Sequence, residues 1–252
     1  MTEPAAELVH YDLTEGVATI TLDSPHNRNA LSTRLVTELF ERLERAENDD
    51  AVRVVALVAT GTVFCSGADL SEAASGDFAD GPRAIARLQR AIAGHSKPVV
   101  CRLQGAVRAG GIGLVAAADI VVASEEASFA LTEVKLGLAP AAISLTVLPR
   151  LTPRAAAYTF LTGEKFTAAE AMAMGLVTFV VTPEEVDAEL ARICAELATG
   201  SPQGLRETKR LLNRDLVAGI DARAEDMAKL SARLFASDEA REAMRAFLSR
   251  GK

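Results

Sequence analysis

Two adjacent glycines open the apolar segment VRAGGIGLVAAADI at residues 107–120. Gly110, Gly111 and Gly113 lie where the strand-like pattern PVVCRLQG gives way to helical spacing. The first turn of a helix has free N–H groups and a partial positive charge, and glycine lets a ligand approach them closely. The segment therefore predicts a site where backbone N–H groups hold a negative charge.

A second loop, VFCSGADL at residues 63–70, repeats this arrangement after the buried strand pattern VRVVALVAT. Asp69 and Glu72 form an Asp-x-x-Glu signal for the start of a helix, so the N–H of Ala68 lies just before that helix. Either loop alone is compatible with a simple tight turn. Together, Ala68 and Gly110 offer two backbone donors at neighbouring strand ends, which favours an oxyanion hole.

Other chemistries fit the sequence less well. Dinucleotide binding needs Gly-x-Gly-x-x-Gly directly after a strand, and the intervals between Gly105, Gly110 and Gly113 do not match it. Cys65 beside Ser66 suggests a nucleophile, but the three histidines are scattered along the chain. Asp119, in an apolar helix-to-strand junction, is predicted to be a buried hydrogen-bonding residue.

The hydrophobic pattern along the chain predicts an α/β fold. A hairpin with a Glu15-Gly16 turn is expected first, followed by a helix that begins at Ser32. Strand and helix patterns then alternate up to about residue 140. Beyond that point only LVTFVV resembles a strand, and the last fifty or so residues are expected to form a helical appendage.

Composition narrows the class of protein. The 252 residues are 49% hydrophobic and carry a formal net charge of -7, which disfavours nucleic acid as a partner. We expect no membrane association and no targeting leader, since no apolar run is long enough to span a bilayer and no charged-then-apolar leader begins the chain. Cys65, Cys101 and Cys194 are odd in number and lie in apolar stretches, which favours reduced thiols, a cytoplasmic location and no metal site.

Several segments resemble the enoyl-CoA hydratase/isomerase, or crotonase, family. They are NRNALS, FCSGADL, KPVVCRLQGAVRAGGIGL, AADIVVAS, FALTEVKLGLAP, LTGEKFTAAEAMAMGLV, SPQGLRETKRLL and SDEAREAMRAFLSR, in the family's order. The resemblance implies a spiral of ββα units over residues 1–200 that holds the acyl-CoA site. It also implies that residues 201–252 form a C-terminal helical region that makes a homotrimer or a dimer of trimers.

The resemblance assigns roles to particular residues. The N–H groups of Ala68 and Gly110 would hold the thioester oxygen of an acyl-CoA, and coenzyme A would be part of the substrate, with no separate cofactor. Of the two glutamates of typical hydratases, one falls on Glu133 and the other on Gly113. Glu133 alone would then move protons, either on a bound water or between two carbon atoms of the substrate.

Further positions are implied to border the substrate. Arg28 would meet the phosphates of the CoA nucleotide, and Phe247 and Arg250 would border the CoA groove of an adjacent subunit. The whole implied substrate-binding set is Arg28, Ala30, Ser66, Asp69, Leu70, Gly111, Gly113, Phe247 and Arg250.

The function expected from this resemblance is an enoyl-CoA hydratase-type lyase. The combination of GGIGL with EVKLGLAPAAIS is similar to hydratases of branched or carboxylated acyl-CoAs, such as methylglutaconyl-CoA-like substrates. An enoyl-CoA isomerase with a single glutamate and a non-catalytic acyl-CoA-binding protein remain the alternatives. We expect the space left by Gly113 to accommodate the acyl group or its bound water, so that Gly113→Glu lowers activity.

Overall fold

A computed structural model describes residues 6–75 and 80–250 of the chain, and at residues 74, 75, 248 and 250 it describes the backbone alone. The strands form two sheets. The larger sheet has the order β1-β2-β3-β5-β7-β10 and the smaller one the order β4-β6-β8-β9. The larger sheet consists of β1 (Val9–Thr14), β2 (Val17–Leu22), β3 (Val54–Ala59), β5 (Val99–Leu103), β7 (Ile120–Ser124) and β10 (Phe179–Val181). The smaller sheet consists of β4 (Val63–Cys65), β6 (Ala106–Arg108), β8 (Ser128–Ala130) and β9 (Phe166–Thr167). The β1–β2 and β8–β9 pairs are antiparallel, and the other pairs are parallel.

The chain winds through these sheets as a spiral. The helices are η1 (Pro25–Asn27), α1 (Thr33–Asn48), α2 (Leu70–Ser75), α3 (Gly81–Gly94), α4 (Gly110–Ala117), η2 (Thr132–Leu136), α5 (Ala141–Val147), α6 (Pro153–Thr162), α7 (Ala168–Met174), α8 (Val186–Thr199), α9 (Pro202–Phe235) and α10 (Asp238–Arg250). In three successive turns a strand of the larger sheet is followed by a strand of the smaller sheet and then by helix. This repeat confirms the expected α/β spiral of ββα units.

The first elements follow from local sequence signals. Glu15 and Gly16 have φ values of 50° and 81°, the left-handed pair of a tight hairpin turn, as predicted. Helix α1 begins after Ser32, whose hydroxyl accepts a hydrogen bond from the N–H of Leu35 at 3.3 Å. This N-cap confirms the predicted start of the helix.

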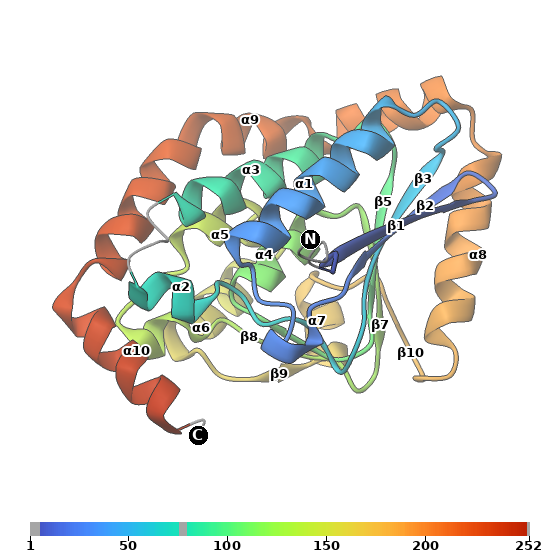
Figure 1. Ribbon diagram of the computed structural model, residues 1–252. Helices are drawn as coiled ribbons and strands as arrows, with labels where there is room; N and C mark the ends of the chain where they lie inside the picture. Colours follow the sequence, from blue (N-terminus) through green and yellow to red (C-terminus); the bar gives the residue numbers. More distant parts are fainter. Residues whose placement is uncertain (1–5, 76–79, 251–252) are drawn as a thin grey trace, which may run out of the picture.

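Helices cover both faces of the larger sheet (Figure 1). Alternation along β3 sends Val54 and Ala56 to a small core with α8, whereas Val55 and Leu57 join the main core on the opposite face. The main core also takes in apolar side chains of α1, α3, α4 and α5. The parallel strands are therefore buried on both sides.

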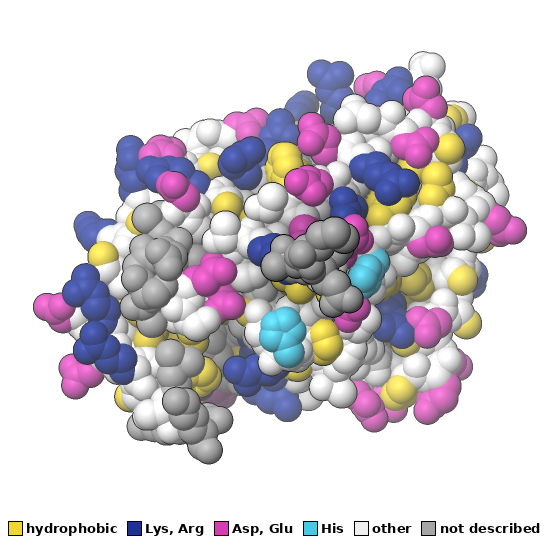
Figure 2. All heavy atoms as spheres, in the orientation of Figure 1, with side chains coloured by type: hydrophobic (Ala, Val, Ile, Leu, Met, Phe, Trp, Pro, Cys, Tyr) yellow, Lys and Arg dark blue, Asp and Glu magenta, His cyan; other side chains and the backbone are white. Residues whose placement is uncertain are grey.

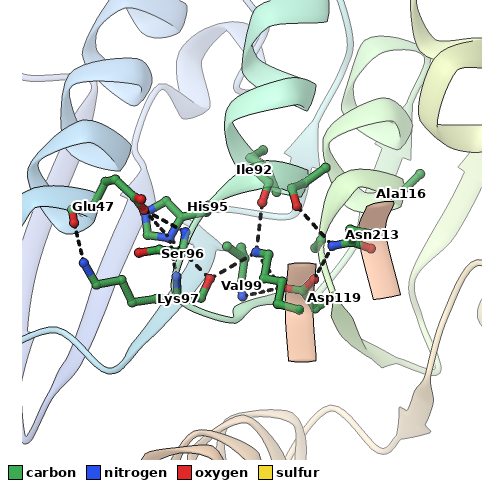
Figure 3. Close-up of polar contacts among 12 residues, drawn as sticks. Glu47, Ile92, His95, Ser96, Lys97, Val99, Ala116, Asp119 and Asn213 are labelled. Carbon is green, nitrogen blue, oxygen red and sulfur yellow. Dashed lines mark hydrogen bonds and ion pairs between the residues drawn. The ribbon is translucent and has the colours of Figure 1, made fainter. Parts of the chain in front are cut away.

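The predicted C-terminal helical region is confirmed as helix, and most of it is α9, with 34 residues. Helix α9 packs along α3 and α5, so it is part of the same folded body as the strands. Lys209 and Asn213 on this helix are buried and reach the carboxylate of Asp119, with Lys209 Nζ 2.7 Å from Oδ2 and Asn213 Nδ2 2.8 Å from Oδ1 (Figure 3). Asp119 has the predicted hydrogen-bonding role, but its side chain is partly rather than fully buried, at 17% exposure. The assembly role of residues 201–252 stays a prediction.

The surface carries charge of both signs. Acidic and basic side chains are interspersed over the face shown in Figure 2. Among the described helices, none is long and apolar enough to cross a membrane. Cys65, Cys101 and Cys194 are buried free thiols, as predicted.

Candidate active site

Three loops leave the smaller sheet at one edge. Strands β4, β6 and β8 are neighbours and run parallel, so their carboxyl ends lie side by side. Ala68, Gly110 and Glu133 each follow the end of one of these strands by two or three residues. The topology thus brings together the three residues that were predicted to act on the substrate.

The loops after β4 and β6 are packed directly against each other. A Cβ atom added to Gly67 would lie 2.8 Å from Cβ of Ala109 and 3.1 Å from the nitrogen of Gly110. A Cβ atom added to Gly110 would lie 3.5 Å from the nitrogen of Ala68. A side chain at 67 would collide with Ala109, and one at 110 would lie 2.9 Å from Cδ1 of Leu31, so glycine at both positions allows the loops to pack this closely.

Neither N–H group has an acceptor among the described residues. Leu31 forms a bridge to the Ala68 loop, but the bond runs from the N–H of Leu31 to the carbonyl of Gly67, at 2.8 Å. Gly110 is the first residue of α4 and has no acceptor within the helix. Within residues 6–75 and 80–250, no hydrogen bond uses the N–H of Ala68 or of Gly110. The two unpaired donors lie at the same sheet edge, and their role as an oxyanion hole stays a prediction.

The backbone before Gly110 is strained. Ala109 has φ 45° and ψ −118°, a conformation that L-residues rarely adopt. Its N–H donates to the carbonyl of Ala130 at 3.1 Å, and its own carbonyl accepts from Ile112 at 2.9 Å. Such strain costs on the order of 1–3 kcal/mol and is common at ligand sites, where the surroundings hold it in place.

Glu133 is a titratable group at this edge whose pKa is raised. Its Oε2 atom is buried, and it has no hydrogen-bond partner among the described residues. Burial raises the pKa of Glu133 to about 7, and the opposing hydrogen bond from its own N–H is the smaller influence. A carboxylate with such a pKa can both take up and release a proton near neutral pH.

The loop of residues 25–31 lies beside the first donor. The N–H of Ser66 donates to the carbonyl of Arg28 at 3.1 Å, and the side chain of Arg28 is exposed. Ala30 is buried. Arg28 is thus free to meet an anionic group in solution, but its role and that of Ala30 stay predictions.

Asn29 shapes this loop, and the sequence analysis assigned it no role. It is fully buried at φ 52°. Its amide donates to the carbonyls of Thr60 at 3.1 Å and Val63 at 2.8 Å, and its side-chain oxygen accepts from the N–H of Ser24 at 2.7 Å. The ability of asparagine to adopt left-handed backbone is the signal in the sequence that points to this role.

Asp69 acts as a local cap. Its carboxylate accepts from the N–H groups of Ser71 at 2.9 Å and Glu72 at 3.4 Å, and from the side chain of Asn27 at 3.3 Å. Burial alone would raise the pKa of Asp69, but these hydrogen bonds outweigh it and lower the pKa below its usual value. The carboxylate of Glu72 accepts from Thr33 at the start of α1, which ties α1 to the oxyanion loop.

The remaining predicted positions have different environments. Leu70 packs against a small cluster formed by Leu138, after η2, and by Ala240 and Met244 on α10. Gly111 faces Cys65, since an added Cβ would lie 2.8 Å from its Cβ. Phe247 is about half exposed on α10. The side chain of Arg250 lies outside the described residues, and the structure does not test the role of Phe247 toward an adjacent subunit.

Cys65 is not suited to nucleophilic chemistry. It is fully buried, and burial raises the pKa of its thiol to about 12. His95 contacts the carbonyls of Leu43 and Lys97, and His10 contacts Asp23. Both histidines are thus engaged with groups other than Cys65.

The expected open space at Gly113 is wrong. A Cβ atom added to Gly113 would lie 2.7 Å from Cγ2 and 3.0 Å from Cβ of Ile143, and 3.3 Å from Cδ of Gln89. Ile143 therefore fills the position that the sequence analysis left for an acyl group or a water. Gly113→Glu is still expected to be harmful, but the physical reason is a collision with Ile143.

The fold is an α/β spiral, and its candidate site has two unpaired backbone N–H groups and one carboxylate with a buried oxygen at the same sheet edge. Comparison with known proteins gives the family. The sequence model described as Enoyl-CoA hydratase/isomerase matches residues 12–252, and this chain belongs to that enzyme family.

The similarity to known relatives extends over nearly the whole chain. A Bacillus subtilis (strain 168) protein named "Probable enoyl-CoA hydratase" is 32% identical over 242 residues, which cover 94% of this chain and 93% of that protein. A crystal structure of an enoyl-CoA hydratase from Mycobacterium avium is 48% identical, covers 97% of both chains and has a TM-score of 0.90. A second crystal structure, of a "Putative enoyl-coA hydratase" from Mycobacterium avium paratuberculosis K-10, is 50% identical, covers 96% of this chain and 97% of that one, and has a TM-score of 0.91.

Proposed function

We propose that this protein is an enoyl-CoA hydratase-type lyase that adds water across the 2,3 double bond of an acyl-CoA thioester. The observation that carries the proposal is the buried, unpartnered Oε2 of Glu133 at the same sheet edge as the free N–H groups of Ala68 and Gly110. The names of the relatives support hydration as the reaction.

One carboxylate is sufficient for this reaction. Ionised Glu133 takes a proton from water as the water oxygen bonds to C3, and the electron pair of the double bond moves through C2 to the thioester oxygen. The N–H groups of Ala68 and Gly110 stabilise the resulting enolate. Glu133 then returns the same proton to C2, and the thioester carbonyl forms again.

An enoyl-CoA isomerase is the second candidate, because Gly113 supplies no second carboxylate. In that reaction Glu133 takes a proton from C2 of a 3-enoyl-CoA and returns it to C4, which moves the double bond without adding water. The same oxyanion hole would hold the enolate.

Product mass distinguishes these reactions. The protein is incubated separately with crotonyl-CoA, a branched 2-enoyl-CoA and a 3-enoyl-CoA, and the products are analysed by chromatography and mass spectrometry. Hydration adds the mass of one water to a 2-enoyl-CoA, whereas isomerisation shifts the retention time of a 3-enoyl-CoA at constant mass. Turnover of none of the three, with acyl-CoA binding retained, would favour a non-catalytic binder instead.

We also propose a homotrimer, alone or stacked in pairs. Leu211 and Leu212 on α9 are 75% and 77% exposed in the single chain, which is unusual for adjacent leucines on a long helix. Replacing both with aspartate is expected to convert the assembly to monomers, measured by sedimentation at micromolar concentration. Arg192→Gln on α8 is the control, and a wild-type protein that sediments as a monomer would contradict the proposal.

A further inference from the structure

The segment of residues 24–31 packs against the loops of both predicted donors. The N–H of Leu31 donates to the carbonyl of Gly67 at 2.8 Å, in the loop of Ala68. The side chain of Leu31 is fully buried and lies against the other loop, since a Cβ atom added to Gly110 would lie 2.9 Å from its Cδ1. One residue of this segment therefore contacts the loop of each donor.

The bond from Leu31 fixes the direction of the first donor. Among the described residues no peptide bond is cis, and in a planar trans peptide the carbonyl and the following N–H point in opposite directions. Because the carbonyl of Gly67 is aimed at Leu31, the N–H of Ala68 is turned away from Leu31. A shift of the Leu31 N–H would therefore rotate the Ala68 donor together with its peptide plane.

Asn29 holds this segment against the connection between β3 and β4. Its side chain is fully buried and donates to the carbonyls of Thr60 at 3.1 Å and Val63 at 2.8 Å. Its side-chain oxygen accepts from the N–H of Ser24 at 2.7 Å, and its own N–H donates to the carbonyl of Ser24 at 2.9 Å. Asn29 is two residues before Leu31, so these bonds fix the chain directly beside the N–H that orients the donor.

We propose that Asn29 is a positioning residue for the reaction, which sets the direction of the Ala68 N–H through Leu31 and Gly67. This inference rests on the proposed function, in which the Ala68 N–H stabilises the enolate. Such a donor is most effective when charge has developed on the oxygen. Loss of the Asn29 bonds should therefore lower kcat more than it raises KM.

Asn29→Gly is the main test. Glycine adopts the φ of 52° without strain, so this variant keeps the backbone turn and loses the three side-chain hydrogen bonds. With crotonyl-CoA, kcat should fall by about 10- to 100-fold, the scale for a misplaced donor. Asn29→Asp is a milder second variant that keeps the acceptor for Ser24 but has no donor for Thr60 and Val63, and its kcat should also fall. Wild-type kcat in both variants would overturn the proposal.

Gln104→Ala is the matched control. The amide of Gln104 also donates to two backbone carbonyls of the connection between β3 and β4, those of Ala59 and Gly61, each at 2.8 Å. Among the described residues, its hydrogen bonds do not reach residues 24–31. Its kcat should stay close to that of wild type, and a fall equal to that of Asn29→Gly would show that loosening this connection is sufficient and would overturn the proposed route through Leu31.

A thioester without the nucleotide separates positioning from CoA binding. Arg28 and Ala30 in the same segment are predicted to border the substrate, so Asn29→Gly could also weaken nucleotide contacts. With crotonyl-pantetheine the fall in kcat should persist, because the thioester carbonyl is unchanged. A loss confined to the CoA thioester would assign the segment to nucleotide binding and overturn the proposal.

A further readout needs no turnover. Hydrogen bonds to the thioester oxygen weaken its C=O bond, so infrared difference spectra of bound butyryl-CoA with a carbon-13-labelled carbonyl report the donors directly. In Asn29→Gly the carbonyl stretch should lie at higher wavenumber than in wild type, and the N–H of Leu31 should exchange faster with deuterium. A wild-type stretch at saturating ligand would overturn the inference even if hydration is found. Absence of turnover in wild type would instead contradict the proposed function, since both spectroscopic readouts are independent of the reaction.

Discussion

Glu133→Gln is expected to lower kcat/KM for the best enoyl-CoA substrate by about 10²- to 10⁴-fold, the range for loss of a general acid–base group. Glutamine keeps the size and the polarity of the side chain but cannot carry the proton. Binding of a saturated acyl-CoA should change little, because the N–H groups of Ala68 and Gly110 are untouched. Stopped-flow or steady-state rates together with calorimetric titration measure the two effects separately.

Glu126→Gln provides the control for this variant. Glu126 is an exposed glutamate before β8, and its replacement should leave the rate unchanged. If Glu133→Gln retained wild-type kcat/KM, the assignment of proton transfer to Glu133 would be wrong.

The pH dependence of the rate follows from the same carboxylate. Burial raises the pKa of Glu133 to about 7, and the ionised form is needed to take the first proton. The kcat/KM of wild type should therefore rise as pH increases through about 7, whereas an ordinary glutamate would place this limb near about 4.3. A rate that is independent of pH from 5 to 8 would contradict a base with this pKa.

Whereas kcat/KM should rise with pH, the contribution of Glu133 to the free energy of unfolding should fall as pH rises. Because folding raises the pKa of Glu133, its favourable contribution is present below the ordinary pKa of glutamate and is lost as pH rises through about 7. Glu133→Gln should accordingly gain Tm relative to wild type at pH 8 but not at pH 4. Thermal unfolding at the two pH values measures this gain, and it would show that the buried carboxylate is retained at a cost in stability.

The sequence predicted the long elements well because their signals are local. The Glu15-Gly16 turn, the Ser32 cap and the glycine-opened helix at residue 110 are each specified by neighbouring residues. The strands β4, β6 and β8 have three residues each, which is too short for a hydrophobic period to be distinct. They are nevertheless the strands that bring Ala68, Gly110 and Glu133 to one edge.

Long-range packing explains what the sequence could not predict. The sequence analysis expected open space at Gly113, but the occupant of that space is Ile143, thirty residues away on another helix. No period or spacing links the two positions. The positive φ of Ala109 could not be predicted from the sequence either, because alanine has no preference for that conformation.

An ion pair between buried Lys209 and partly buried Asp119 connects α9 to the C-terminal end of α4. Lys209 Nζ lies 2.7 Å from Oδ2 of Asp119 and 3.0 Å from each of the carbonyl oxygens of Ile92 and Lys97, so its three donors are all used. The carboxylate of Asp119 also accepts from the N–H of Val99 at 2.8 Å (Figure 3). Burial lowers the pKa of Lys209, and the attraction of Asp119 opposes that shift.

Arg150 joins the same helix end. Its guanidinium donates to the carbonyl of Ala116 in the last turn of α4 at 3.0 Å and to that of Ala118, the C-cap residue, at 3.3 Å. A cation at this end is favourable for the helix. The polar cluster thus fixes the C-terminus of the helix whose N-terminus carries the Gly110 donor.

Lys209→Met is therefore expected to lower the free energy of unfolding by about 3–5 kcal/mol, because it leaves the charge of Asp119 buried without its partner. At roughly 2–4 °C per kcal/mol for a chain of this size, the fall in Tm should be on the order of 10 °C. The double variant Lys209→Met, Asp119→Asn should be more stable than Lys209→Met alone, because the unpaired charge is removed. Arg214→Gln, which breaks the exposed pair with Asp215, should have little effect. Denaturation is measured at one fixed protein concentration, since assembly also contributes to Tm, and a Lys209→Met loss as small as that of Arg214→Gln would show that the pair does not anchor α9.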